Sequence, residues 1–197
     1  MSIPKAMIFI DGENLVMRYQ AMLEQGYEPS DGIIHEPDYF VWHPKISTNT
    51  LLDLIRVLYY TSAVGDENKI TAAKKRIAEV HYQFHSESVL GNAQIYPCVF
   101  KKLAQSKKTR SVDINIVIDI MKYAYSDAID QIYLISGDGD YLPLIHEVMQ
   151  KGKQVMVGAL SSGLNHTLVH SVDEFINLDN FFFKPKTDVQ STIVTAA

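Results

Sequence analysis

The chain has 197 residues, of which 47% are hydrophobic and 21% are charged, and this suggests one compact domain with a sizeable core. Its formal net charge of -5 argues weakly against a general nucleic-acid coating protein, but not against an enzyme whose carboxylates hold metal ions. The apolar runs are too short to span a bilayer, so no membrane partner is expected, and the single cysteine, Cys98, fits a reducing cytoplasm.

Predicted strands and helices alternate along the chain. Short apolar runs are typical of buried strands, and longer segments with apolar residues three or four apart are typical of helices. The predicted strands are Met7–Ile10, Leu54–Thr61, Gln94–Lys101, Gln131–Ile135, Gln154–Ala159 and the short Phe175–Leu178. The predicted helices are Glu13–Gln25, Glu67–Ser86, Val112–Tyr125, Tyr141–Gln150 and Leu164–His170. This order predicts a three-layer α/β fold with a mainly parallel central sheet and helices on both faces.

Two segments stand outside this alternation. Gly26–Lys45 is polar and rich in proline, and we predict a long loop or insertion with short structure of its own. Residues 184–197 contain few core-forming side chains. We therefore expect a single domain over residues 1–183, followed by a flexible C-terminal tail.

Acidic residues stand where predicted strands end and where one predicted helix begins. Asp11 ends the first strand, Asp138 and Asp140 follow the fourth, and Asp113 opens the third helix. Ligands of parallel α/β sheets bind beyond the carboxyl ends of the strands, so we expect these carboxylates to meet at one edge. A hard divalent cation, Mg²⁺ or Mn²⁺, would relieve their mutual repulsion. The alternative is that each aspartate only caps a helix, but capping alone does not explain several acidic junctions at one edge.

Three other polar residues accompany the aspartates. Asn14 lies one helical turn after Asp11, where it either orients a substrate phosphate or only partners Asp11 at the helix start. Ser136 either supports a carboxylate, contacts phosphate or makes a turn hydrogen bond. Asp119 is six residues beyond Asp113 and about 120° around the helix. We therefore treat Asp119 as a second-tier candidate, solvated or supporting the site rather than binding metal.

A basic stretch leads into Asp113. Lys101–Arg110 contains five basic residues and no acidic one. Lys107, Lys108 and Arg110 are therefore predicted to bind the phosphates of a single nucleic-acid strand, with ordinary solvated surface as the alternative.

Aromatic residues are concentrated in the predicted insertion. Tyr27, Tyr39, Phe40 and Trp42 either stack on unpaired bases or pin this segment to the protein body. The large burial energy of aromatic side chains favours pinning. The chain has no Gly-x-Gly-x-x-Gly or Walker-type loop, so a nucleotide cofactor is not expected.

The acidic motifs, taken together and in this order, resemble those of NYN domains, which are PIN-like nucleases, and the bacterial LabA-like group is the most similar type. The motifs are Phe9-Ile10-Asp11-Gly12-Glu13-Asn14, Ser111-Val112-Asp113 with Asp119, and Ser136-Gly137-Asp138-Gly139-Asp140-Tyr141. The resemblance runs from about Ala6 to Leu178. It departs at Arg110-Ser111, where the family often has Lys-Gly, so the charge is kept and the flexible glycine is lost. The resemblance implies a PIN-like fold and Mg²⁺- or Mn²⁺-dependent RNA cleavage, with Asp11, Asp113 and Asp138 as metal ligands and Asp140 beside them.

Our leading hypothesis is a metal-dependent ribonuclease that acts on single-stranded RNA through the catalytic residues Asp11, Asp113, Asp138 and Asp140. A haloacid-dehalogenase-like phosphatase also carries an aspartate after its first strand, but it needs a second one where Glu13 stands. The other alternative is a non-catalytic RNA-binding or regulatory module with the same fold, which the intact set of acids disfavours.

Overall fold

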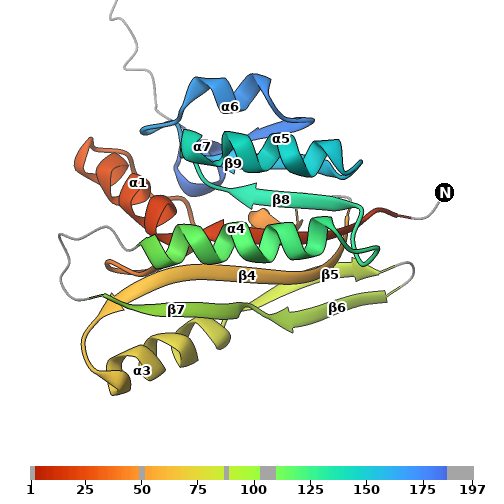
Figure 1. The fold of residues 1–197 in the computed structure, drawn as a ribbon. Helices are drawn as coiled ribbons and strands as arrows, with labels where there is room; N and C mark the ends of the chain where they lie inside the picture. Colours follow the sequence, from red (N-terminus) through yellow and green to blue (C-terminus); the bar gives the residue numbers. More distant parts are fainter. Residues whose placement is uncertain (1–2, 49–51, 87–88, 103–109, 186–197) are drawn as a thin grey trace, which may run out of the picture.

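The computed structural model describes residues 3–48, 52–86, 89–102 and 110–185 (Figure 1). The strands are β1 (Lys5–Asp11), β2 (Ile34–Glu36), β3 (Phe40–Trp42), β4 (Asp53–Val64), β5 (His81–Ser86), β6 (Val89–Gln94), β7 (Tyr96–Lys102), β8 (Gln131–Ile135), β9 (Gln154–Ala159) and β10 (Glu174–Asn177). The helices are α1 (Gly12–Glu24), α2 (Lys45–Thr48), α3 (Glu67–Ala78), α4 (Arg110–Ala124), α5 (Leu142–Gln150), α6 (His166–His170) and α7 (Asp179–Phe182), with a 3₁₀ turn at Gly139–Tyr141.

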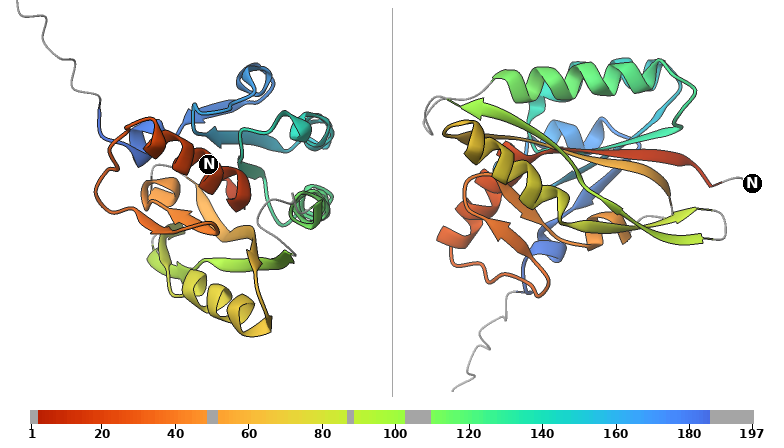
Figure 2. Two further views of the ribbon diagram at one scale, coloured as in Figure 1. Left: turned by 90° about the vertical axis from the view of Figure 1, so that its left-hand side faces the viewer. Right: turned by 90° about the horizontal axis from the view of Figure 1, so that it is seen from below.

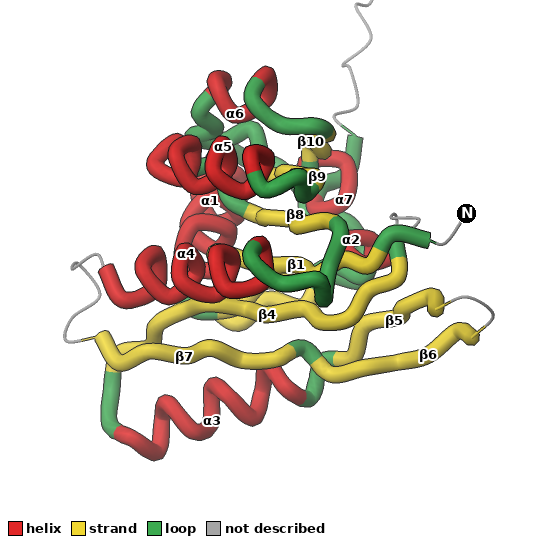
Figure 3. The backbone as a smooth tube through the Cα atoms, turned by 45° about the vertical axis from the view of Figure 1, so that its right-hand side comes forward, coloured by secondary structure: helices red, strands yellow, loops and turns green. Residues whose placement is uncertain are grey.

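A parallel sheet forms the centre of the molecule. Within the described residues its six strands follow the order β10-β9-β8-β1-β4-β7 (Figure 3). Every adjacent pair in this sheet is parallel. Strand β1 is central, so Ile8 pairs with Val57 on one side and with Tyr133 on the other. The predicted α/β fold with a mainly parallel sheet is therefore confirmed.

Helices cover both faces of this sheet (Figure 2). Along β1 the buried side chains alternate, as the pleat of a strand requires. Ile8 and Ile10 belong to the core beneath α1 and α3, whereas Met7 and Phe9 belong to the core beneath α4 and α5. Because β1 is buried on both faces, its sequence is a continuous apolar run rather than an alternating one.

The predicted insertion has structure of its own. Strands β2 and β3 form an antiparallel hairpin that packs against the core on the α1 face. Phe40 and Trp42 are fully buried, and the backbone N–H of Val41 donates to the Tyr59 hydroxyl at 3.0 Å. Pinning is therefore confirmed for these two aromatic side chains, whereas Tyr27 and Tyr39 are only partly buried.

The predicted helix Glu67–Ser86 is wrong in its second half. Helix α3 ends at Ala78, and the chain then forms an antiparallel hairpin of β5 and β6, which lies beyond the amino-terminal end of β7 (Figure 1). The side chains of Val80 and Tyr82 are buried, whereas His81 is exposed. This alternation has the two-residue period of a strand, which outweighs the helical spacing of the preceding residues.

The predicted flexible tail lies almost wholly outside the described residues, which end at Pro185. The helices in the described part of the chain include none with the length and apolar character needed to cross a lipid bilayer.

Candidate functional site

The carboxyl ends of the central strands bring acidic residues together. Asp11 is the last residue of β1, and Asp138 follows β8, whose last residue, Ile135, pairs with Ile10. Asp113 lies in the first turn of α4. Because β1 and β8 are parallel neighbours, Asp11 and Asp138 leave the sheet at the same edge.

The Asp11 carboxylate is held by three hydrogen-bond donors. Its Oδ1 accepts from the backbone N–H of Asn14 at 3.0 Å, which caps α1. Its Oδ2 accepts from Ser136 Oγ at 3.1 Å and lies 3.3 Å from the Tyr141 hydroxyl. Asp11 therefore both caps a helix and belongs to a network that joins β1, β8 and the 3₁₀ turn.

Tyr141 connects two of the predicted carboxylates. Its hydroxyl lies 3.3 Å from Asp11 Oδ2 and 3.5 Å from Asp113 Oδ1, and it can donate its single proton to one of them at a time. Burial and the adjacent Asp11 raise the pKa of Tyr141, so the hydroxyl stays protonated as a donor. Sequence reasoning gave this residue no role, although it is the last residue of the third acidic motif.

Burial dominates the electrostatics of Asp11. Asp11 is 3% exposed, and the pKa of its carboxyl is raised from 3.8 to about 7, mainly by burial. Within this shift the nearby Asp113 and Glu13 also act to raise the pKa, while the hydrogen bonds from Asn14 and Ser136 act to lower it. The groups that partly offset the cost of burying the charged carboxylate are thus uncharged hydrogen-bond donors.

The loop after β8 is fixed by further hydrogen bonds. Asn14 Oδ1 accepts from the Gly137 N–H at 3.1 Å, and Ser136 Oγ accepts from the Asp138 N–H at 3.2 Å. Asp138 Oδ1 in turn accepts from the Asp140 N–H at 3.0 Å and so caps the 3₁₀ turn. Asn14 and Ser136 therefore hold the two acidic loops in place relative to each other.

Gly12 permits a close approach between α1 and β4. A Cβ at this position would lie 2.2 Å from Tyr59 Cε1 and 2.7 Å from the backbone oxygen of Tyr60. Only glycine fits this contact without displacing the strand. Gly12 therefore fixes how closely the start of α1, next to Asp11, approaches β4.

A cavity of about 650 Å³ opens at this edge of the sheet, and we call it the acidic cavity. Its charged lining consists of six carboxylates and two cations. The carboxylates belong to Asp11, Glu13, Glu24, Asp38, Asp113 and Asp138, and the cations to Arg18 and Lys102.

Glu13 is a site residue that sequence reasoning considered only as a departure from a phosphatase motif. Its Oε1 accepts from Ser62 Oγ and lies 3.2 Å from Lys102 Nζ. The side chains of Lys102 and Glu13 are 16% and 18% exposed, so this ion pair is largely buried and salt screens it only weakly. The position of Glu13, two residues after Asp11, was the signal available in the sequence.

The remaining candidates lie elsewhere. Asp140 is exposed and is not part of the lining of the acidic cavity. Asp119 accepts a hydrogen bond from the Tyr60 hydroxyl at 2.7 Å. Arg110 begins α4, and Lys107 and Lys108 lie outside the described residues.

The carboxylates suit a hard divalent cation in their chemistry. They offer only oxygen donors, and a cation would offset the cost of burying Asp11. In the described part of the chain, however, no three His, Cys, Asp or Glu side chains are grouped so that they could hold an ion. Joint binding of one ion by Asp11, Asp113 and Asp138 would therefore require their side chains to move from the positions seen here.

Comparison with known proteins agrees with the fold. The family model of the NYN domain matches residues 5–179, which is most of the chain. No curated protein matches the sequence significantly. Among solved structures, a protein of unknown function from Vibrio parahaemolyticus is similar, with a TM-score of 0.62 and 16% sequence identity. That alignment covers 92% of this chain and 97% of the other, and at this identity it supports the fold alone.

Proposed function

The chain belongs to the NYN domain family, and we propose that it is a Mg²⁺- or Mn²⁺-dependent ribonuclease that hydrolyses phosphodiester bonds of single-stranded RNA. PIN-like domains of this kind are usually nucleases and generally use divalent metals. The observation that carries the proposal is that Asp11, Asp113 and Asp138, from three separate segments, line one cavity at the carboxyl edge of the sheet.

Asp11, Asp113 and Asp138 are the residues that would hold the cation. When bound there, a divalent cation supplies an activated water and offsets the charge of the scissile phosphate. Tyr141 and Ser136 orient the Asp11 carboxylate through their hydroxyl groups. Such supporting hydrogen bonds fix the direction of a ligating oxygen and tune its basicity.

The other polar residues of the acidic cavity have distinct roles in this proposal. Asn14 fixes the Gly137 loop, so that Asp138 stays beside Asp11. Lys102 and Arg18 are the cations that line the cavity, and they contact the phosphates on either side of the scissile bond. No side chain needs to act as a nucleophile. Cys98 is poorly suited to that role, because burial raises the pKa of its thiol to about 12.

Two narrower assignments belong to the same proposal. The order of the three acidic motifs supports placing the chain in the LabA-like group of the family. The single cysteine, Cys98, supports a reducing cytoplasmic setting.

The experiment is cleavage of a labelled single-stranded RNA in the presence of Mn²⁺, Mg²⁺ or EDTA, comparing the wild type with Asp138→Asn. This substitution keeps the shape of the side chain and removes its charge. Asp127→Asn is the matched control, because Asp127 is exposed in the turn that follows α4. We expect metal-dependent cleavage by the wild type and the control, and a loss of about 100-fold or more in Asp138→Asn.

Other outcomes change the conclusion. RNA binding by the wild type without turnover in any metal would establish the non-catalytic module instead. Equal cleavage by the wild type and Asp138→Asn would show that the acidic cavity is not the catalytic site. Asp140→Asn, tested alongside, decides whether the exposed Asp140 contributes to catalysis.

A further inference from the structure

A second cavity of about 560 Å³ adjoins the acidic cavity, and we call it the adjoining cavity. The two share Asp38 and Lys102 in their linings, so they lie side by side, and we call them together the groove. The adjoining cavity lies between the β2–β3 turn, the end of β4 and α3. The groove thus crosses the carboxyl edge of the sheet from β8 and β1 towards β4.

The charge of the groove changes along its length. The lining of the adjoining cavity contains three cations, on Lys69, Arg76 and Lys102, and two carboxylates, on Glu36 and Asp38. It also contains the aromatic ring of Tyr39, which packs against the core on one side and is partly exposed. A groove that combines cations with an open aromatic ring is the kind of surface that binds single-stranded nucleic acid.

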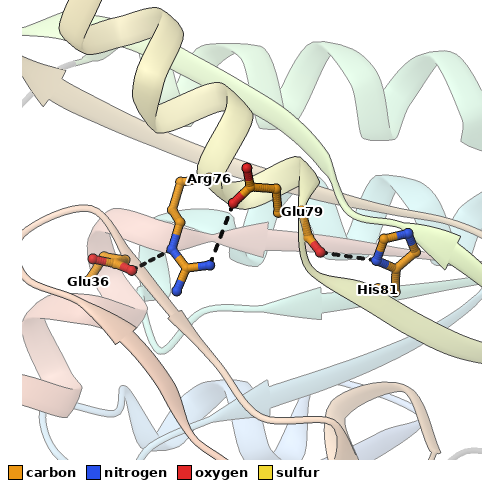
Figure 4. A network of polar contacts seen from close by, with 4 residues as sticks. All are labelled: Glu36, Arg76, Glu79 and His81. Atoms are coloured by element: carbon orange, nitrogen blue, oxygen red, sulfur yellow. Dashed lines mark hydrogen bonds and ion pairs between the residues drawn. The ribbon is translucent and has the colours of Figure 1, made fainter.

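An ion-pair network holds the wall of the adjoining cavity in place (Figure 4). Arg76 Nε lies 2.5 Å from Glu36 Oε1, and another nitrogen of the same guanidinium lies 3.8 Å from Glu79 Oε2. This network ties the β2–β3 turn to α3, and Tyr39 lies in that turn. The ring of Tyr39 is therefore presented on a braced turn, which reduces the entropy lost when a base stacks on it.

Lys69 is a cation of the adjoining cavity that takes no part in this network. Its side chain lies across Gly65, and its backbone N–H donates to Asp66 at the start of α3. Lys69 is exposed, so its ammonium group can reach a phosphate with little desolvation cost.

We propose that the adjoining cavity is a base-binding subsite for the RNA strand that the acidic cavity cleaves. In this subsite Tyr39 stacks on an unpaired base, and Lys69 and Lys102 contact the phosphates on either side of that nucleotide. The assignment of the strand as RNA rests on the function proposed above. The strand would follow the groove across β1 and β4, so binding would extend several nucleotides from the scissile bond.

The test measures binding of a fluorescein-labelled octauridylate to the full chain by anisotropy in EDTA, so that no cleavage occurs. Replacing Tyr39 by leucine keeps an apolar side chain against the core and removes the stacking surface. We expect Tyr39→Leu to weaken binding about 5-fold to 100-fold, and Tyr39→Phe to restore it, because the phenyl ring still stacks.

Two controls separate this effect from general changes at the surface. Tyr96→Leu removes a tyrosine that is 54% exposed at the amino-terminal end of β7, whereas Lys102 of the adjoining cavity lies at the carboxyl end of β7. This substitution should leave affinity unchanged. Lys69→Gln should weaken binding and lower the dependence of log Kd on log salt by about one, whereas Lys75→Gln on the same helix should change neither.

Wild-type affinity in a folded Tyr39→Leu protein would overturn the subsite, as would equal weakening by Tyr39→Leu and Tyr96→Leu. If Tyr39→Leu does not fold, Lys69→Gln compared with Lys75→Gln still decides whether the strand enters the adjoining cavity, through affinity and the salt dependence. Weak binding by Tyr39→Leu beside a wild type that cleaves nothing would support the subsite and refute the nuclease. Normal cleavage by the wild type, with unchanged binding in the Tyr39 and Lys69 variants, would support the nuclease and refute the subsite.

Discussion

The acidic cavity and the adjoining cavity share Lys102 and Asp38, yet their other lining residues come from different parts of the fold. The carboxylates of the acidic cavity stand mainly at strand ends and helix starts of the central α/β unit. The adjoining cavity is formed largely by the β2–β3 insertion and by α3. In this molecule the parallel sheet fixes where the proposed chemistry occurs, and an insertion forms the wall that would hold the substrate.

The first and largest expected effect is on the free energy of unfolding of the protein, through the buried Asp11 of the acidic cavity. Because burial raises the pKa of Asp11 from 3.8 to about 7, the folded protein binds a proton there that the unfolded chain has already lost. The stability that this group contributes is therefore complete below about pH 4 and is lost as the pH rises through 7. Asp11→Asn should raise the free energy of unfolding at pH 8 by up to about 4 kcal/mol in EDTA, and by much less at pH 5.

Urea unfolding at the two pH values measures this effect, with Asp127→Asn as the exposed control. A destabilised Asp11→Asn protein at pH 8 would show that the hydrogen bonds to the carboxylate outweigh its burial. The carboxylates in the lining of the adjoining cavity, on Glu36 and Asp38, are not buried, so substitutions there should not reproduce this loss of stability between pH 5 and pH 8.

The same contrast explains how far sequence reasoning reached. Asp11 and Asp138 were predictable as neighbours because each follows an apolar run, and parallel strands end at one edge. Asp113 was expected at that edge because its helix returns over the sheet, and the structure places it in the lining of the acidic cavity.

The adjoining cavity was not predictable in this way. Tyr39 belongs to an irregular segment whose position depends on the burial of Phe40 and Trp42 against the core. Nothing in its spacing relates it to Lys69, which is thirty residues further along the chain. The partners of Glu13 could not be predicted for the same reason. Ser62 and Lys102 are distant in sequence, and they lie near Glu13 only because of the order of the strands in the sheet.

The second prediction concerns the network within the acidic cavity. Tyr141→Phe removes the hydroxyl between Asp11 and Asp113, while Ser136 still donates to Asp11. We expect cleavage to fall about 10-fold to 100-fold, mainly in kcat or in the concentration of Mn²⁺ needed, because supporting hydrogen bonds of ligands have effects of this size.

Tyr133→Phe is a matched control for this change. The Tyr133 hydroxyl is buried on β8, and in the described part of the chain it has no hydrogen-bond partner. Its removal should leave cleavage unchanged. Equal rates for Tyr141→Phe and Tyr133→Phe would show that the hydroxyl at position 141 does not orient the carboxylates.

The third prediction concerns the boundary between the two cavities. Lys102 lines both of them and pairs with Glu13 at 3.2 Å. Lys102→Gln should weaken octauridylate binding about 3-fold to 10-fold at low salt and reduce the salt dependence by about one, as expected for one lost phosphate contact. Lys122→Gln, exposed near the end of α4, is the control. If the two variants bind RNA alike, Lys102 serves only to neutralise Glu13.

The smallest expected effect concerns the role of Asp38, which lines both cavities. Asp38 has a positive φ of 71° in the β2–β3 turn, a conformation that asparagine tolerates as well as aspartate does, so Asp38→Asn should not change the stability of the fold. If Asp38 only lines the path of the strand, removing its charge should tighten octauridylate binding in EDTA about 2-fold to 4-fold by relieving repulsion of phosphate, with cleavage retained. If Asp38 instead acts with Asp11 and Asp113, cleavage should fall as it does in Asp138→Asn. Measuring both quantities on one preparation separates these cases, since a carboxylate that repels the substrate and one that holds a cation have opposite effects when they are neutralised.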